Sequence, residues 1–280
     1  MKKIGIIVGL LLLSLGAFAQ DKLHNLQIAY EVSNYKYREP GLMYLRAQPK
    51  QGISILYTRR SVLSGDVSES DRSFASLEFR YMTGKVDYHG GRFDGTPLTL
   101  YNLKDYYFEG VLRVGAAYDL NENWELWPYL GFGWRQLRNH LEEGGPGGYL
   151  RESTYWYLPI GLNTRFHTES GWNFVLNGEF DWLLKGTQYS GEMDLGEPIG
   201  TLDGNTNAQN QGYGVRISLK AEKSLGKIGL FVEPFWRYWH IQNSSIGGKD
   251  LINYPGWYLD GFYEPKNYTH EYGLKAGITF

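Results

Sequence analysis

Long stretches of the sequence alternate apolar and polar residues with a period of two, and helical periodicity is scarce from Asp21 onward. Successive side chains of a β-strand point to opposite faces, so this alternation predicts strands with one apolar and one polar face. Ten segments show the pattern: 24–37, 49–60, 72–87, 103–119, 123–139, 150–167, 171–187, 210–224, 227–242 and 266–280. The chain is therefore predicted to be an all-β protein.

The polar face of these segments carries charges of both signs in mid-strand, with glycine between them. In segment 171–187, one face holds Trp172, Phe174, Leu176, Phe180, Trp182 and Leu184, and the other holds Asn173, Asn177, Glu179, Asp181 and Lys185. Collected over the strands, the acids are Glu31, Glu78, Glu109, Glu125, Glu179, Asp181, Glu222, Glu233 and Glu271, and the bases are Arg80, Arg113, Arg135, Arg165, Arg216, Lys220, Arg237 and Lys275. The negative charges of the acids and the positive charges of the bases are nearly equal in number. Opposite charges that line a narrow interior can pair, whereas unpaired charges there are costly.

This arrangement predicts an up-and-down antiparallel transmembrane β-barrel of about ten strands, with the apolar face toward lipid and an ion-pair network in the lumen. A mean hydropathy of -0.41 argues against a helical membrane protein, but not against a barrel in which only alternate residues face lipid. The chain has no Cys, which excludes disulfides and thiol chemistry. A net charge of -2 gives no basic footprint for nucleic acid.

The N-terminus has the pattern of a secretory signal peptide. Lys2 and Lys3 form a positive start, residues 4–15 are almost wholly apolar, and Ala17-Phe18-Ala19 matches a small-x-small cleavage site. The apolar run is too short for a transmembrane anchor. We expect residues 1–19 to be removed and residues 20–280 to form the barrel domain in the outer membrane of a Gram-negative bacterium.

The connections between the predicted strands alternate in length. Short ones lie at 119–123, 167–171 and 224–226, and long polar ones lie around 86–104, 140–150, 186–209 and 243–266. Outer-membrane barrels have short periplasmic turns and long extracellular loops, so this alternation predicts the orientation. The stretch 61–71 is longer than this pattern requires.

Aromatic residues gather near the predicted strand ends. Tyr118 and Trp124 flank one short turn as Phe166 and Trp172 flank another, which predicts a periplasmic aromatic girdle; ordinary core aromatics are the alternative. A second group is interpreted as the outer girdle, with a glycan-stacking platform as the alternative: Trp236, Tyr238, Trp239, Tyr155, Trp156 and Tyr157. The last strand has Tyr272, Leu274, Ala276, Ile278 and Phe280 on one face, and resembles the insertion signal of outer-membrane barrels. The resemblance implies recognition of this strand by the barrel-assembly machinery.

Three segments resemble the omptins, a family of outer-membrane barrel proteases: Asp105–Gly110, Trp182–Gly186 with Tyr189–Gly191, and Tyr272–Lys275 continuing to Thr279-Phe280. The resemblance implies a ten-stranded barrel in contact with outer-membrane lipid and lipopolysaccharide. Omptins need an acidic pair on one side of the barrel mouth and an Asp-x-His pair on the other. No His lies between Thr168 and Trp239, although Asp181 and Asp194 are present. The architecture therefore carries over to this chain, and the protease activity does not.

Other chemistry in the sequence is sparse. Asp87-Tyr88-His89, with Asp94 nearby, places a carboxylate and an imidazole two residues apart on one strand face, where they can form an acid–base pair. A solvated polar loop is the commoner reason for such a pattern. His240 and His270 are expected to approach each other, but two His without a third ligand are poor evidence for a metal site. We predict neither a metal nor a cofactor.

Three functions remain open at this point. The first is a structural or surface-interaction barrel with a largely closed lumen and an extracellular ligand that the sequence does not identify. The second is an omptin-like hydrolase with a rearranged site, which the missing imidazole disfavours. The third is a small-solute channel, which the balanced lumen disfavours, because ten strands enclose far less space than the 16–18 strands of porins.

Overall fold

The computed structural model describes residues 24–62, 72–92, 95–194, 201–247 and 263–280. The predicted signal peptide, Asp94 and most of the stretch 61–71 lie outside these residues. No helix among them is long and apolar enough to cross a membrane.

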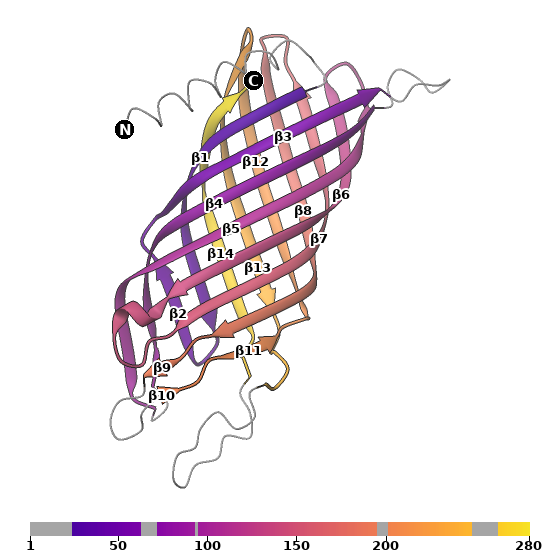
Figure 1. Cartoon of the computed structure of the whole chain (residues 1–280). Coiled ribbons are helices and arrows are strands. Elements are labelled where there is room, and N and C mark those ends of the chain that lie inside the picture. Colours follow the sequence, from indigo (N-terminus) through magenta and orange to yellow (C-terminus); the bar gives the residue numbers. More distant parts are fainter. Residues whose placement is uncertain (1–23, 63–71, 93–94, 195–200, 248–262) are drawn as a thin grey trace, which may run out of the picture.

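Ten long antiparallel strands close on themselves (Figure 1). They are β1 (His24–Glu39), β3 (Lys50–Val62), β4 (Arg72–Gly91), β5 (Pro97–Asp119), β6 (Trp124–His140), β7 (Leu150–His167), β8 (Trp172–Ser190), β12 (Gly212–Leu225), β13 (Ile228–Ile241) and β14 (Asn267–Thr279). Each pairs with the next in this order, and β14 pairs with β1. The predicted up-and-down ten-stranded barrel is confirmed, and most strand bounds lie within two residues of those expected.

Short elements lie at one end of the barrel, which we call the loop end. They are β2 (Met43–Ala47), the 3₁₀ turn η2 (Leu141–Gly144), β9 (Met193–Asp194), β10 (Thr201–Leu202) and β11 (Asn205–Ala208). The opposite end, called the turn end, holds the short connections after β5, β7 and β12, and the C-terminus lies there in Figure 1. The three short connections predicted at 119–123, 167–171 and 224–226 therefore lie at the turn end, and the described parts of the long ones predicted around 140–150, 186–209 and 243–266 lie at the loop end.

One predicted loop is mostly strand. Residues 86–104 were expected to form a long polar connection, but β4 continues to Gly91 and β5 begins at Pro97. A β-bulge between Val86 and Tyr88 and a positive φ of 58° at Asn102 interrupt the regular alternation there. The strand residues within 86–104 include many polar ones, because the outer surface of this part of the barrel is polar.

The outer surface changes character along the barrel axis. Toward the turn end, exposed apolar side chains form a continuous belt on every long strand: Tyr30, Val32, Ile53, Ile55, Leu77, Phe79, Leu112, Val114, Leu130, Phe132, Ile160, Leu162, Leu176, Phe180, Ile217, Leu219, Leu230, Val232 and Leu274. Toward the loop end, the outward positions become polar, for example Lys36 and Arg38 on β1 and Gln136 and Arg138 on β6. We call these the belt half and the loop half. On β1 the boundary lies after Val32, and on β6 it lies after Trp134.

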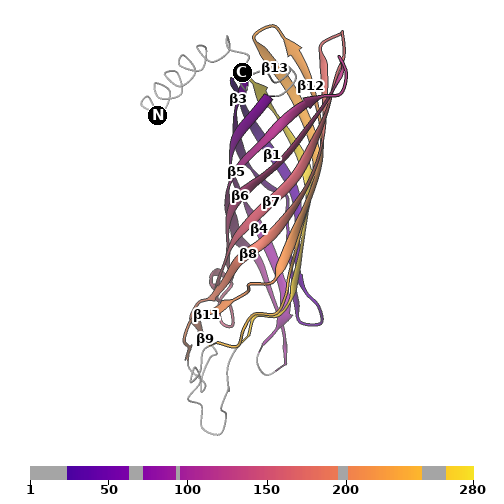
Figure 2. The ribbon, with the colours of Figure 1, turned by 90° about the vertical axis from the view of Figure 1, so that its right-hand side faces the viewer.

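The strands are much longer than a hydrocarbon layer requires. A tilted strand of about 9–11 residues spans it, whereas β5 has 23 residues and β4 has 20. Figure 2 shows the resulting long, narrow barrel from the side. The apolar belt therefore covers only part of the strand length, and the loop half extends beyond it.

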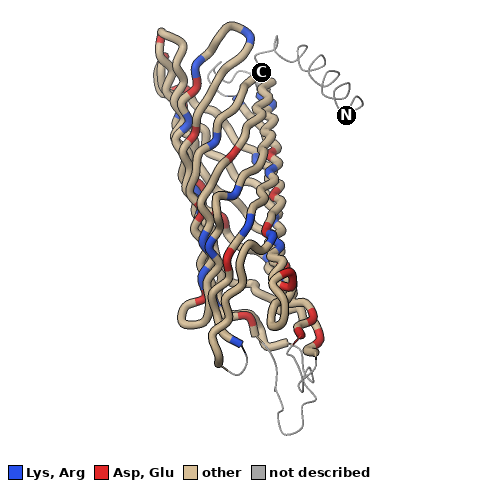
Figure 3. The backbone as a smooth tube through the Cα atoms, turned by 90° about the vertical axis from the view of Figure 1, so that its left-hand side faces the viewer, with Lys and Arg blue, Asp and Glu red and all other residues tan. Residues whose placement is uncertain are grey.

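The interior changes in the opposite sense. In the belt half it is ionic, and Figure 3 shows acidic and basic positions following one another along the strands. In the loop half the interior contains a cluster of buried apolar and aromatic residues: Tyr35, Tyr37, Met43, Leu45, Ala47, Met82, Val86, Tyr88, Leu98, Leu100, Leu103, Tyr107, Leu137 and Leu141. The loop half therefore combines an apolar interior with a polar outer surface, as a soluble β-protein does.

Two predictions of side-chain direction are wrong. Lys185 was expected on the polar face of β8, but a bulge opposite Trp156 and Tyr157 shifts the register, so Lys185 pairs with outward-facing Trp156 and is exposed. The expected outer girdle was only half correct. Trp156, Trp236 and Tyr238 face outward, whereas Trp239, Tyr155 and Tyr157 are buried in the lumen. Neighbouring aromatics on one strand point to opposite faces, so consecutive ones cannot all belong to a girdle.

The four aromatics that flank the short turns lie on the outer surface at the turn end. Tyr118, Trp124 and Trp172 are 40–46% exposed, and the ring of Trp124 lies 4.7 Å from that of Phe166 on the adjacent strand. They border the apolar belt on the side away from the loop half. This is the position that the predicted girdle requires.

Candidate functional site

Strand register places residues of opposite charge side by side in the lumen. Across β13, β14 and β1, Glu233 is paired in register with Lys275, and Lys275 with Glu31. Across β4, β5 and β6, the corresponding row is Arg80, Glu109 and Arg135. Cross-strand neighbours of opposite charge stabilise a sheet. The alternation of sign from strand to strand thus builds the network before any contact across the lumen is made.

Contacts across the lumen then join these rows. The Arg216 guanidinium lies 2.6 Å from Glu109 Oε1, 2.6 Å from Asp181 Oδ2 and 3.2 Å from Glu179 Oε1. Arg80 contacts Glu31 at 3.1 Å and Glu78 at 2.5 Å, and also pairs with Glu109. Glu109 therefore joins guanidinium groups from β4 and β12.

A second set of contacts lies beside the first. Arg237 Nη2 is 2.8 Å from Glu31, and its Nη1 is 3.6 Å from Glu271. Lys275 Nζ lies 3.7 Å from Glu31 and 3.5 Å from Glu233. These distances connect three adjacent strands, β1, β13 and β14, to the central network.

Tyrosines complete the central layer. Tyr107 donates to Glu271 at 3.0 Å, and Tyr157 donates to Glu109 at 2.8 Å; both side chains are fully buried. The Arg135 guanidinium stacks on the ring of Tyr107 at 4.1 Å. Sequence analysis placed Arg135 in the lumen but did not include the tyrosines. Tyr107 is two residues from Glu109 on β5, and Tyr157 is eight residues from Arg165 on β7, so in each case period-two alternation places the tyrosine on the same strand face as the charged residue.

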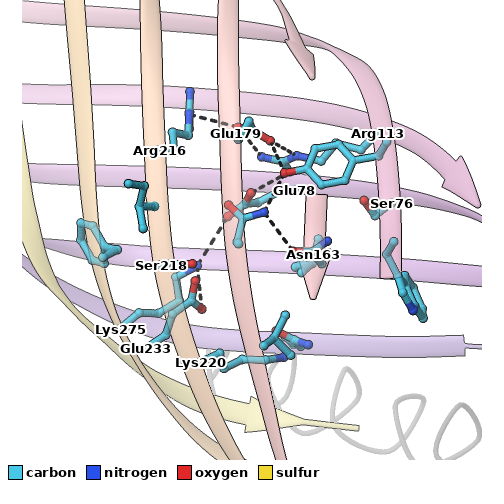
Figure 4. Close-up of a pocket in the computed structure, with 18 of the residues that line it drawn as sticks. Ser76, Glu78, Arg113, Asn163, Glu179, Arg216, Ser218, Lys220, Glu233 and Lys275 are labelled. Atoms are coloured by element: carbon cyan, nitrogen blue, oxygen red, sulfur yellow. Dashed lines mark hydrogen bonds and ion pairs between the residues drawn. The ribbon is translucent and has the colours of Figure 1, made fainter. Parts of the chain in front are cut away.

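A polar cavity of about 130 Å³ lies on the turn-end side of this layer (Figure 4). Arg113 borders it and contacts Glu179 at 2.6 Å and Glu78 at 2.9 Å. Asn177 donates to the hydroxyl of Tyr129 at 2.7 Å. Most of the charged side chains that line the cavity already have partners, and a polar lining suits bound water better than an apolar ligand.

The remaining predicted lumen residues lie toward the turn end. Glu125 accepts from Trp127 Nε1 at 2.7 Å, and Lys220 lies 3.2 Å from Glu222. Arg165 stacks on the ring of Trp127. The nine acids and eight bases collected over the strands in the sequence are buried or half-buried in this structure, and most of them meet a residue of opposite charge.

The loop half contains an ionic cluster that sequence analysis missed. Arg151 on β7 lies 2.7 Å from Glu39 Oε1 and pairs with Glu264, and Tyr37 donates to Glu39 at 2.8 Å. These side chains are buried, and the outward residues at this level of β1 are charged, so the cluster lies outside the apolar belt. Burial, reinforced by the charge of Glu264 and opposed by Arg151, raises the pKa of Glu39 to about 7. Glu39 is eight residues from Glu31 on β1, so period-two alternation predicts that both side chains point inward.

Lys50 and Asp105 form a second buried pair that was missed. Lys50 pairs with Asp105, and its ammonium lies 3.5 Å from the ring centroid of Tyr35. Asp105 is four residues from Glu109 on β5, so both side chains point to the same face of the strand. This spacing is the sequence signal for the inward direction of Asp105. Lys50 is harder to predict, because it begins β3 directly after Pro49.

The sequence-predicted acid–base pair does not face the lumen. The inward residues of this part of β4 are Val86 and Tyr88, so Asp87 and His89 lie on the outer surface. Asp87 accepts a hydrogen bond from the Asn102 backbone N–H at 2.9 Å, and His89 stacks on Tyr44 at 4.6 Å. The geometry places both groups in structural contacts on the wall of the barrel.

The two His considered for a metal site also face outward. His240 packs edge-on against Tyr268 at 4.7 Å, and His270 lies 4.8 Å from Tyr238. Within the described ranges, no group of three His, Cys, Asp or Glu residues has the arrangement of a metal site. Asp194, at the loop end, accepts a backbone hydrogen bond from Gly147 through its carbonyl oxygen at 2.8 Å.

No protein-family model and no curated protein matches this sequence. Among solved structures, the chain is similar to the outer membrane protease OmpT from Escherichia coli, with a TM-score of 0.60, 13% identity, and coverage of 93% of this chain and 97% of that one. The translocator domain of the autotransporter NalP from Neisseria meningitidis gives a TM-score of 0.42 at 10% identity, covering 98% of this chain and 97% of that one. The similarity to OmpT confirms the omptin-type barrel architecture. At 13% identity it establishes the fold alone.

Proposed function

We propose that this protein is an outer-membrane barrel with a closed lumen, whose loop half stands above the membrane and meets partners at the cell surface. The observation that carries the proposal is the packed ionic layer at the centre of the barrel. Glu31, Glu109, Glu271, Tyr107 and Tyr157 are each no more than 1% exposed. An open channel needs a continuous water-filled path, and this layer interrupts it.

Planar-bilayer conductance tests the closed lumen. We expect the purified, refolded protein to give no stable channels under conditions in which a porin control conducts. Stable openings of porin size would contradict the proposal and favour the small-solute channel. A Tyr107→Ala, Tyr157→Ala double variant sharpens the test, because removing two rings of the central layer opens space there without removing a charge. We expect this variant to conduct more current across the bilayer than the wild type.

The apolar belt supports membrane insertion, and a basic collar beside it supports contact with lipopolysaccharide. Five exposed, outward cations lie just beyond the belt: Lys36, Arg38, Arg46, Lys85 and Lys104. Lys36 is paired in register with Arg46, and Lys85 with Lys104. Like charges directly opposite each other are destabilising, and within the described ranges none of the five forms an ion pair. Phosphate groups of the outer leaflet would offset this repulsion.

A lipopolysaccharide-binding assay tests the collar. We expect a Lys85→Gln, Lys104→Gln variant to bind purified lipopolysaccharide more weakly than the wild type. Arg59→Gln is the matched control, because Arg59 is exposed on β3 toward the turn end, away from the collar. Equal loss in the control would show that net charge, not the collar, governs binding.

The orientation is tested with single cysteines, since the natural chain has none. Glu143 is exposed at the loop end and Glu122 at the turn end. We expect a membrane-impermeant maleimide to label Glu143→Cys on intact cells, and Glu122→Cys only after the outer membrane is permeabilised. The reverse pattern would contradict extracellular loops.

The C-terminal strand supports recognition by the barrel-assembly machinery. Phe280 exchanges backbone hydrogen bonds with Leu26 of β1, at 2.8 and 3.2 Å, and so closes the barrel at the turn end. We expect deletion of Phe280 to reduce the amount of folded barrel in cells while refolding in detergent proceeds. Equal loss in cells and in detergent would indicate a purely structural role.

A further inference from the structure

Two arginines stack on one tryptophan at the turn end of the lumen. Trp127 on β6 is fully buried and faces inward. The Arg165 guanidinium carbon lies 3.7 Å from a Trp127 ring centroid, and that of Arg60 lies 4.5 Å away. Cations on an aromatic face are attracted to it, but the ring does not neutralise their charge.

Neither guanidinium has a carboxylate partner among the described residues. In the central network, by contrast, Arg80, Arg216 and Arg237 each contact at least one carboxylate. Arg165 Nε is buried and makes no hydrogen bond. A buried donor without an acceptor is costly, so Arg165 is less well satisfied than the arginines of the central network.

The nearby acids already have partners. Glu222 lies 3.2 Å from Lys220 and accepts from Thr279 at 3.0 Å. Glu125 lies 3.2 Å from Arg72 Nη2, which also pairs with Asp119, and 3.6 Å from His167. Glu125 and Glu222 therefore attract Arg60 and Arg165 only at longer range, without a direct carboxylate contact among the described residues.

A cavity of about 80 Å³ lies against these two cations. Besides Arg60 and Arg165, its lining includes Lys220, Asn25, Gln27, Thr58, Asn173, His167, Val175 and Glu222. Apart from Val175 and Glu222, these side chains carry N–H or O–H donors. Arg165 and Lys220, together with Gln27, Thr58 and Val175, also line the larger lumen cavity, so the two cavities are adjacent.

We propose that this turn-end cavity is a binding site for a phosphate group. A phosphate oxyanion would accept from the Arg60 and Arg165 guanidiniums and offset both charges. Guanidinium forks suit this geometry, because they bind phosphate oxygens with two parallel hydrogen bonds. The group can come from free phosphate or from a lipid headgroup at the membrane surface. The site does not depend on which side of the membrane the turns face.

The test uses the full folded barrel in a non-ionic, phosphate-free detergent. Thermal unfolding and calorimetric titration with inorganic phosphate are compared with chloride at equal ionic strength. We expect phosphate to raise the unfolding temperature of the wild type, and Arg60→Gln and Arg165→Gln to weaken phosphate binding about tenfold or more, the loss of a charge-assisted pair. Arg59→Gln makes the same change on the outward face of the same strand and should bind like the wild type.

A second arm distinguishes the source of the phosphate. The titration is repeated in vesicles of phosphatidylglycerol. If a headgroup occupies the site, free phosphate binds in detergent but not in these vesicles, and the vesicles themselves stabilise the wild type more than Arg60→Gln. If the site takes free phosphate, binding persists in both media.

Folding of each variant is checked by its heat-modifiable migration in gels. If a Gln variant does not fold, Arg60→Lys keeps the charge and loses the fork, and should bind phosphate with intermediate strength. The proposal is overturned if neither phosphate nor the anionic vesicles stabilise the wild type beyond chloride. It is also overturned if Arg59→Gln loses as much binding as Arg60→Gln.

Discussion

The two halves of this barrel use the same strands with opposite polarity. In the belt half the outer face is apolar and the lumen is mainly ionic; in the loop half the outer face is mainly polar and the lumen contains a cluster of buried apolar and aromatic side chains. On β1, Glu31 faces inward and Val32 outward, whereas six residues later Tyr37 faces inward and Arg38 outward. The backbone alternation is unchanged across the boundary. The surrounding medium therefore decides which kind of side chain occupies each face.

The comparison also shows how an ionic interior becomes tolerable. A closed barrel satisfies its backbone hydrogen bonds between strands, so the lumen need not be apolar. Charges there must then be paired, because removing one member of a buried pair leaves an uncompensated charge. The interior of the loop half is stabilised mainly by burial of apolar side chains, and its buried charged side chains gather around Arg151 and Lys50.

The largest expected effect comes from breaking the central network. Glu109→Gln leaves Arg80 and Arg216 undercompensated, and we expect a loss of about 3–5 kcal/mol in the free energy of unfolding. The matched control is Glu152→Gln, which breaks the outward pair with Arg138 and should cost about 0–1 kcal/mol. Urea unfolding in lipid vesicles measures both. Equal costs would remove the energetic distinction between lumen and surface.

A slightly smaller effect is expected from the apolar interior of the loop half. Leu45 is fully buried there, and Leu45→Ala should cost about 2–5 kcal/mol through lost burial and a residual cavity. Leu112→Ala makes the same change on the belt, where lipid fills the space, and should cost less. If Leu112→Ala proves the more damaging, the loop half lacks the packed core described here.

Charge insertion on the outer face tests the boundary between the halves. Leu130 lies in the belt and Gln136 lies beyond it on the same strand. Leu130→Arg should cost about 2–4 kcal/mol in a bilayer, as for charges near the midplane of other barrels, whereas Gln136→Arg should cost about 0–1 kcal/mol. The comparison is made by unfolding in vesicles. Similar costs at both positions would mean that the boundary lies elsewhere.

The smallest effect concerns pH. Because the pKa of Glu39 is raised to about 7 in the folded protein, the folded state holds a proton that the unfolded chain releases at lower pH. Its contribution to stability is therefore fully present below the ordinary carboxyl pKa and is lost as pH rises to about 7. We expect the stability difference between wild type and Glu39→Gln to shift in favour of the variant from pH 4 to pH 8. A pH-independent difference would show that Glu39 does not titrate in this range.

Much of this structure is predictable from the sequence, because period-two alternation fixes both the strands and their faces. The inward direction of Glu179 and Asp181, for example, follows from their apolar neighbours on β8. Alternation fails where the register shifts: the bulge opposite Trp156 turns Lys185 outward, and no local signal in the sequence marks it.

The contacts across the lumen are the part that sequence analysis cannot supply. Arg216 meets Glu109 although the two are 107 positions apart and lie on strands that are not neighbours. Such pairings depend on strand stagger around the closed barrel, which alternation does not encode. The Glu39 and Arg151 cluster was missed for a different reason: these residues lie in segments whose outer face is also polar, so the contrast between the two faces is weak.

The two halves of the barrel are defined by where the membrane boundary lies along the strands, and a depth profile measures this position directly. Single spin labels at the outward positions of β6 from Leu126 to His140, in lipid vesicles, report access to oxygen and to a water-soluble nickel reagent. We predict that oxygen access dominates through Trp134 and nickel access from Gln136 onward. A profile without this crossover, or with nickel access across the apolar belt, would contradict the account.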